Sequence, residues 1–210
     1  MTQDLTPGST PDSTPASLTG RLLVATPALG DPQFRRTVVL VLDHDEAGAL
    51  GVVVNRPSTV EVAGVLPPWE PFVALPAVLF QGGPVARNSA VGLCALVVGP
   101  GVDKGDAADE TGDEPLGWRR VSGSLGLIDL DAPPQVLAAE IARLRIFAGY
   151  AGWAAGQLEA EIAQDAWWVV EAEPADPFTA EPESLWRAIL RRQPGELAMV
   201  STFPDDPALN

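Results

Sequence analysis

The sequence is poor in cysteine, which forms disulfides, and in histidine, which often acts as a general base or metal ligand. It has one of each among 210 residues. Cys94 cannot form an intrachain disulfide, and its place in the apolar run Val91–Val98 predicts a buried, unreactive thiol. No apolar run approaches the roughly 20 residues of a membrane-spanning helix. The first 17 residues have neither a basic start nor an apolar centre, so they do not resemble a secretory signal. These absences predict a soluble protein of the reducing cytoplasm.

Basic residues are also scarce. Thirteen Lys and Arg stand against 28 Asp and Glu, which gives a formal net charge of −15. The first 17 residues carry −2 and the stretch Gly99–Gly117 carries −5, so about −8 remains on the body of the chain. Nucleic acids are bound chiefly by Lys and Arg that neutralise phosphates, and no helix-turn-helix, zinc-finger or RNP-type pattern occurs here. We therefore expect no direct binding of nucleic acid.

The composition fits one folded domain. With 46% hydrophobic residues the chain can bury a core, and no Pro/Gly-rich linker divides it. We predict a disordered tail over residues 1–17, which are rich in Ser, Thr and Pro, followed by a single domain over residues 18–210. An acidic stretch at about 102–117 is expected to be a disordered insertion in that domain.

Local patterns predict many strands followed by helices. The clearest is a β-hairpin, in which the apolar runs Thr37–Leu42 and Leu50–Val54 flank the loop Asp45–Gly48. Strands are expected at Leu22–Ala25, Thr37–His44, Leu50–Asn55, Val78–Gln81, Val91–Val97, Trp118–Val121, Leu125–Asp129, Arg145–Ala148 and Trp167–Glu171. Helices are expected at Val60–Leu66, Pro133–Leu144, Trp153–Gln164 and Pro182–Arg192. This order favours an α+β fold with mostly antiparallel strands over a doubly wound sheet.

Charged and amide side chains gather at the ends of the predicted hairpin. His44, the only histidine, could act as a general base, bind a metal together with Glu46, or simply cap backbone groups. Arg36 could bind a carboxylate or phosphate, or it could clamp Asp31 or a loop carbonyl inside the fold.

The far end of the hairpin supplies two further candidates. Asn55 suits an Asx-type turn that closes the strand, whereas Arg56 has no evident packing role and is the better ligand candidate. Eight extended residues span roughly 26 Å, so His44 at the loop should lie apart from Arg36 unless the hairpin curls strongly. We therefore expect Arg36, Asn55, Arg56 and Gln157 to share one surface region.

Two glycine runs could hold a phosphate or could let backbones pack closely. Gly82-Gly83-Pro84 follows a predicted strand, and Gly149–Trp153 follows another and is expected to open a helix. Neither fits a Walker A loop or a dinucleotide-binding turn, so we favour close packing, with Tyr150 in the core. On the helix that follows, Gln157 is expected to reach back to the hairpin ends, and Glu159 and Glu161 to face water.

These stretches together resemble the YqgE/AlgH family of bacterial proteins. The resemblance is carried by GRLLVATPALGDPQFRRTVVLVLDHDEAGALGVVVNRP at residues 20–57, GGPV at 82–85, GYAGWAAGQLEAE at 149–161, and the later Trp167–Val170 and Leu185-Trp186. It covers about Leu18 to Ala198. The resemblance implies an α+β fold with a bifurcated, mostly antiparallel sheet, partly closed as a small barrel and surrounded by helices. Some members of that family carry the label of putative transcriptional regulator.

No complete set of nucleophile, base and orienting group can be assembled, because Ser122 and Ser124 lie outside a G-x-S-x-G motif and share one histidine. We therefore predict a non-enzymatic binding or regulatory module without metal or cofactor, whose partner is a protein or a small anionic ligand. The alternative is an anion-binding protein or enzyme that uses the region of Arg36, Asn55 and Arg56. A direct transcriptional regulator fits the family label but not the charge. The candidate surface comprises Arg36, His44, Asn55, Arg56, Gly83, Tyr150 and Gln157.

Overall fold

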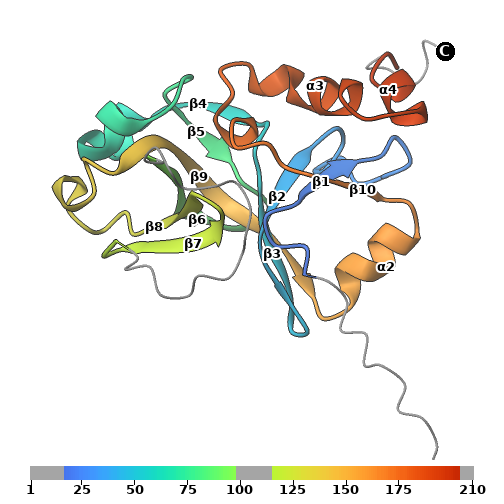
Figure 1. Ribbon diagram of the computed structural model, residues 1–210, viewed down its shortest axis with the longest axis horizontal. Coiled ribbons are helices and arrows are strands. Elements are labelled where there is room, and N and C mark those ends of the chain that lie inside the picture. The colour runs from blue at the N-terminus through green and yellow to red at the C-terminus, as the bar shows by residue number, and fades with distance from the viewer. Residues whose placement is uncertain (1–16, 98–114, 204–210) are drawn as a thin grey trace, which may run out of the picture.

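The computed structural model describes residues 17–97 and 115–203 (Figure 1). The predicted tail up to residue 16 and the predicted insertion up to residue 114 lie outside the described residues. At the edges of those two segments, the Ser17 hydroxyl donates to the His44 carbonyl at 3.0 Å, and the Gly117 carbonyl accepts from the Asp129 N–H at 2.8 Å. Within the described ranges no helix is long and apolar enough to cross a membrane.

Strands dominate the described chain, and its helices are short. The strands are β1 (Leu22–Ala25), β2 (Val38–Asp45), β3 (Gly48–Val53), β4 (Pro57–Glu61), β5 (Val78–Gln81), β6 (Val85–Leu96), β7 (Trp118–Ser122), β8 (Leu125–Ile128), β9 (Ile141–Ala154) and β10 (Trp167–Val170). The α-helices are α1 (Val62–Val65), α2 (Gln157–Ala163), α3 (Leu185–Arg191) and α4 (Glu196–Val200). Single turns of 3₁₀-helix are η1 (Pro67–Phe72), η2 (Pro134–Val136), η3 (Asp176–Phe178) and η4 (Pro182–Ser184).

The strands form one curled sheet that branches at β9. Eight of them lie side by side in the order β10-β1-β2-β3-β9-β6-β8-β7, whereas β4 pairs with β5 and β5 also joins β9. The pairing of β5 with β9 is parallel, and the other pairings between these strands are antiparallel. The sheet curls into a half-barrel, so the predicted α+β class with mostly antiparallel strands is confirmed.

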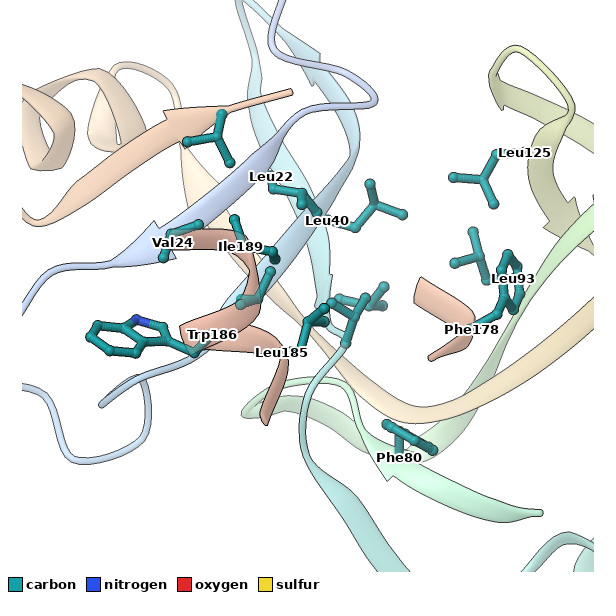
Figure 2. Close-up of a cluster of buried hydrophobic side chains, with 14 of the residues drawn as sticks. Leu22, Val24, Leu40, Phe80, Leu93, Leu125, Phe178, Leu185, Trp186 and Ile189 are labelled. Carbon is teal, nitrogen blue, oxygen red and sulfur yellow. The ribbon is translucent and has the colours of Figure 1, made fainter. Parts of the chain in front are cut away.

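Both faces of β1 are buried, which explains its continuous apolar sequence. Successive side chains of a strand point to opposite faces. Leu22 and Val24 belong to the cluster beneath α3 (Figure 2), whereas Leu23 and Ala25 pack in a second cluster with Leu158 of α2. In Figure 1, α3 and α4 accordingly lie on one side of β1, β2 and β10, and α2 lies on the other.

Helix α3 is held on the sheet by its apolar face. Leu185, Trp186 and Ile189 are buried against β1 and β2 (Figure 2), and the Trp186 indole N–H donates to the Ala25 carbonyl at 2.9 Å. The helix predicted at Pro182–Arg192 is confirmed as η4 followed directly by α3.

The other half of the sheet has its own core. Its buried members include Val62, Trp69, Cys94, Trp118, Leu144 and Ile146. Cys94 is fully buried, and burial raises the pKa of its thiol to about 12. The predicted burial of this thiol is confirmed, and the raised pKa disfavours the thiolate, which is the reactive species of cysteine.

The predicted helix over Pro133–Leu144 is wrong. Only the turn η2 forms there, and β9 already begins at Ile141. Leu137 and Leu144 do reach the same cluster, but Leu144 does so as a strand residue opposite Cys94 of β6. A turn followed by a strand can bury residues at the spacing of a helical stripe, so local periodicity could not distinguish the two.

The helix predicted at Trp153–Gln164 begins four residues late. Gly152 and Trp153 pair with Leu50 and Ala49 of β3, and Gly156 adopts a left-handed φ of 72° before α2 starts at Gln157. The expectation that the Gly149–Trp153 run opens a helix is therefore wrong, because this run is part of β9. Pairing with β5 likewise makes a strand of Pro57–Glu61, which shortens the predicted helix at Val60–Leu66 to α1.

The two glycine runs meet where the chain passes across β9. The Gly82 N–H donates to the Ala148 carbonyl at 2.9 Å, and the Gly82 carbonyl accepts from the Val53 N–H at 2.8 Å. A Cβ at Gly82 would overlap the Gly149 carbonyl oxygen, and one at Gly149 would lie 2.6 Å from the Val85 carbonyl oxygen. The close-packing interpretation of these glycines is confirmed, since side chains would separate the crossing backbones.

We expect Gly82→Ala to lower the free energy of unfolding by about 3 kcal/mol, because backbone, not a flexible side chain, would have to shift. The matched control is Gly64→Ala in α1, where open space surrounds the site and alanine should stabilise by at most about 1 kcal/mol. Urea unfolding followed by tryptophan fluorescence measures both. Equal stabilities of the two variants would contradict the close crossing.

Candidate functional site

Two neighbouring clefts lie beside the glycine crossing. The first, called here the arginine cleft, has a volume of about 210 Å³ and is lined by Gln33, Val53, Arg56, Gln81, Gly83, Pro84, Arg87 and Ala148. The second, called the indole cleft, has a volume of about 180 Å³ and is lined by Leu29, Asp31, Phe34, Pro84, Gly152, Trp153, Gln157, Glu161 and Trp167. Pro84 lines both, so the clefts adjoin.

Two arginines from different elements line the arginine cleft. Arg56 lies between β3 and β4, is half-buried, and donates to the Arg35 carbonyl at 3.0 Å. Burial lowers the pKa of Arg56, and the nearby negative charge of Asp31 partly opposes this shift. Arg87 is exposed, and its side chain makes no hydrogen bond or ion pair within residues 17–97 and 115–203.

A bulge in β6 places Arg87 over the cleft. Val85 pairs with Tyr150 and Ala90 pairs with Ala148, so the four residues between them on β6 leave the regular ladder. Ala86 within this bulge has a φ of 48°, which is unfavourable for a residue with a Cβ. Such conformations cost on the order of 1–3 kcal/mol and cluster at functional sites.

The indole cleft is walled by three aromatic rings. Ring centroids lie 6.1 Å apart for Trp153 and Trp167, 5.6 Å for Phe34 and Trp167, and 6.5 Å for Phe34 and Trp153. Both indole N–H groups donate to Oε2 of Glu161, at 2.9 and 2.8 Å. The Gln157 amide donates to Oε1 of Glu161 at 2.9 Å, so three neutral donors hold this carboxylate.

Three of the predicted site residues line these clefts. Arg56 and Gly83 lie in the arginine cleft and Gln157 in the indole cleft. Gln157 accepts from the Ala154 N–H at 3.1 Å, so it reaches back to the end of β9. Tyr150 is half-buried against the main core, opposite Val85, and does not line either cleft.

Arg36 and Asn55 are structural partners that close the hairpin. The Asn55 amide accepts from the Val38 N–H and donates to the Arg36 carbonyl, both at 2.9 Å. Asn55 is buried, and this pair closes the hairpin where Arg36 adopts a left-handed φ of 54°. The Arg36 guanidinium donates to the Phe203 carbonyl at 3.0 Å and lies 4.8 Å from the Trp186 ring, so it holds the C-terminal segment against the fold.

His44 lies apart from the arginine cleft, at the loop end of the hairpin. Its Nδ1 accepts from the Leu18 N–H at 3.1 Å, which requires the hydrogen to sit on Nε2. Nε2 then donates to Oε1 of Glu159 in α2 at 2.7 Å. His44 therefore joins the N-terminal segment to α2, and it does not pair with Glu46. Among the described residues, no three His, Cys, Asp or Glu side chains form a group that could hold a metal ion.

Sequence patterns missed the roles of four polar residues. Arg87 stands in an exposed polar run with no periodic signal, and only the β6 bulge brings it to a cleft. Glu159 and Glu161 were expected to face water, yet one binds His44 and the other the two indoles. Arg145 was expected only as part of a strand.

Arg145 is a fully buried cation on β9, outside both clefts. Its Nη2 donates to the carbonyls of Leu75 and Thr179 at 2.9 and 3.1 Å, and its guanidinium lies 4.0 Å from the centroid of the Phe80 ring. Within the described chain, its Nε and Nη1 have no hydrogen-bond partner. Burial lowers the pKa of Arg145 to about 10, so the group stays charged at neutral pH and ties two loops to the sheet.

The hydrogen bond between His44 and Glu159 should make the stability of the fold depend on pH. The pKa of Glu159 is lowered because its carboxylate accepts from its own backbone N–H and from His44. A carboxyl whose pKa is lowered in the folded state stabilises the fold at pH values above the ordinary carboxyl pKa. This stabilisation is lost as the pH falls through the lowered pKa of the folded state. We expect Glu159→Gln to cost at most about 1 kcal/mol near neutral pH, because the carboxylate is 42% exposed.

The measurement is urea unfolding of both proteins across a series of pH values. The difference between wild type and Glu159→Gln should vanish in acid. Glu46→Gln, which alters an exposed acid in the same hairpin loop, is the control and should show no such pattern. A difference that persists unchanged in acid would rule out the carboxylate as its source.

Known proteins are similar to this chain over most of its sequence. The family model for AlgH-like proteins matches residues 22–198. A UPF0301 protein of Streptomyces coelicolor is 58% identical over 195 residues, which cover 93% of this chain and 96% of that protein. A UPF0301 protein of Mycobacterium tuberculosis is 45% identical over 191 residues, which cover 91% and 90%.

Two solved structures have the same fold. The crystal structure of a protein from Corynebacterium diphtheriae is similar with a TM-score of 0.75 and 35% identity, covering 88% of this chain and 92% of that one. The solution structure of the AlgH protein from Pseudomonas aeruginosa is similar with a TM-score of 0.62 and 29% identity, covering 96% and 100%. The chain, from the hairpin to the C-terminal helices, therefore belongs to the AlgH-like family of UPF0301 proteins.

Proposed function

We propose that this protein is a cytoplasmic, non-enzymatic binding module whose arginine cleft holds the carboxylate or phosphate of a small ligand. The observation that carries the proposal is the convergence of Arg56 and Arg87 on one cleft. Guanidinium groups bind carboxylate and phosphate through paired, charge-assisted hydrogen bonds. The amides of Gln33 and Gln81 line the same cleft and offer further donors.

The charge distribution of the chain supports this assignment. The protein carries a formal net charge of −15, so two arginines that converge on one cleft are a local exception to its overall field. Arg87 has no partner within the described residues, and an anion placed between Arg56 and Arg87 would supply one. The strained Ala86 beside Arg87 fits a position kept for binding.

The side chains of the arginine cleft suit binding better than catalysis. Its charged and polar lining consists of two arginines and two glutamines, which are poor nucleophiles and do not titrate near neutrality. The groups that could do acid–base or nucleophilic work lie elsewhere: His44 is paired with Glu159, and Cys94 is buried. We therefore assign the cleft to ligand recognition, through which the protein would regulate a partner.

The test is titration with inorganic phosphate and acetate, followed by NMR amide shifts. We expect shifts at Gly83 and Arg87 and a weakening of about tenfold or more on Arg56→Gln or Arg87→Gln, since each removes a charge-assisted contact. Arg143→Gln is the matched control, because this exposed arginine lies on β9 five residues from Ala148, about 16 Å along the strand. Equal weakening by the control would refute a specific arginine site.

The acidic field also predicts that a regulatory role does not involve direct DNA binding. Like charges repel at long range, and the formal net charge of −15 opposes the approach of a phosphate backbone. In a gel-shift titration at about 150 mM salt, neither random nor promoter duplex should bind below micromolar concentrations. Tighter binding to either duplex would contradict this prediction.

A further inference from the structure

We propose that the indole cleft is a cation subsite continuous with the arginine cleft, so that the ligand is a small zwitterion. Its carboxylate would lie at Arg56 and Arg87, and its ammonium would lie at Asp31 and Glu161. This inference rests on the proposed anion-binding role of the arginine cleft and adds the chemical class of the ligand.

Continuity of the two clefts is the first argument. Pro84 lines both, and the loop before β2 contributes Gln33 to the arginine cleft and Asp31 and Phe34 to the indole cleft. Small-molecule sites usually enclose at least about 300 Å³. Each cleft alone is smaller than that, at about 210 and 180 Å³, whereas a ligand that spans both has room of the usual size.

The polarity of the combined site is the second argument. The charged groups of the arginine cleft are both cationic, and those of the indole cleft, Asp31 and Glu161, are both acidic. Asp31 lies at the junction, close enough to Arg56 for the two charges to interact, whereas Glu161 has no such partner among the cleft arginines. A ligand with one charge would meet one favourable end and one unfavourable end. A zwitterion aligned with this polarity gains at both ends.

The state of Glu161 is the third argument. Its carboxylate is held by the indole N–H groups of Trp153 and Trp167 and by the Gln157 amide. These donors fix its position, but none of them is a cation, so its negative charge has no ionic partner among them. An ammonium group in the cleft would be a positively charged partner for the Glu161 carboxylate.

The aromatic walls suit the same group. Phe34, Trp153 and Trp167 line the cleft and pack against one another, with 5.6 to 6.5 Å between their ring centroids. Aromatic rings attract cations through their quadrupole and exclude water from the charge pair beside them. The walls therefore favour an alkylammonium over a second anionic or strongly hydrated neutral group.

The experiment uses a series of amino acids of increasing length, each paired with the acid that lacks the amine. The amino acids are glycine, β-alanine, γ-aminobutyrate and ε-aminocaproate, and the matched acids are acetate, propionate, butyrate and caproate. Isothermal titration up to about 10 mM covers the millimolar affinities expected of such small ligands. We expect one length of amino acid to bind at least about tenfold tighter than its matched acid.

Two conservative variants test where the amine lies. Glu161→Gln and Asp31→Asn should each reduce the advantage of the best amino acid over its matched acid by about threefold or more, and the acid itself should bind no more weakly than before. Glu46→Gln, an exposed acid in the hairpin loop, is the control and should change neither affinity. Both test variants keep side-chain volume, and urea unfolding checks that they remain folded.

The outcomes separate this inference from the proposed function. If every acid binds as tightly as its amino acid, or if the advantage survives both variants, the cation subsite is refuted while the anion site stands. If none of the acids binds, or if Arg56→Gln leaves their binding unchanged, the proposed function itself fails and the zwitterion inference falls with it.

Discussion

The rest of the structure depends on one constraint, the close approach of the backbone at Gly82 to the backbone of β9 at Gly149. Gly82 is bonded both to Ala148 of β9 and to Val53 of β3, and a Cβ at Gly82 would overlap the carbonyl oxygen of Gly149. This close approach lets β3, β5 and β6 all meet β9, so the sheet can branch and curl. The arginine cleft is the outer surface of the same crossing, and Gly83 and Ala148 belong to its lining.

Around this crossing, buried polar contacts fix the segments that carry the clefts. Asn55 closes the hairpin by binding both Val38 and the carbonyl of Arg36, and Glu161 holds two indoles that wall the second cleft. Arg145 ties two loops to β9 by their carbonyls. Each buried hydrogen bond adds only modestly to the free energy of unfolding, but a buried donor or acceptor without a partner is costly. These bonds therefore specify one geometry more than they add stability.

Charged side chains distinguish the two clefts within an acidic protein. Several described arginines are engaged in the fold, as Arg192 is by Asp176 at 2.6 Å and Arg145 by the carbonyls of Leu75 and Thr179. Arg56 and Arg87 differ because they converge on a surface hollow beside an acidic, aromatic neighbour. A small site with opposite charges at its two ends can select a small ligand in a way that a uniformly acidic surface cannot.

The amino-acid sequence by itself determined the class of fold, the family and most strands. β-Branched runs between turn residues indicate strands locally, and the two buried faces of β1 produce one continuous apolar run. It also assigned the glycine runs to close packing, whereas its choice of Arg56 as the better ligand candidate stays a prediction. Only the tertiary structure decided that Ile141–Leu144 is strand, since pairing with β6 outweighed a helix-like spacing. Tertiary structure alone also paired His44 with Glu159 and brought Arg87 and Glu161 to the clefts. Those placements depend on a bulge and on contacts between residues far apart in the chain, which local periodicity does not record.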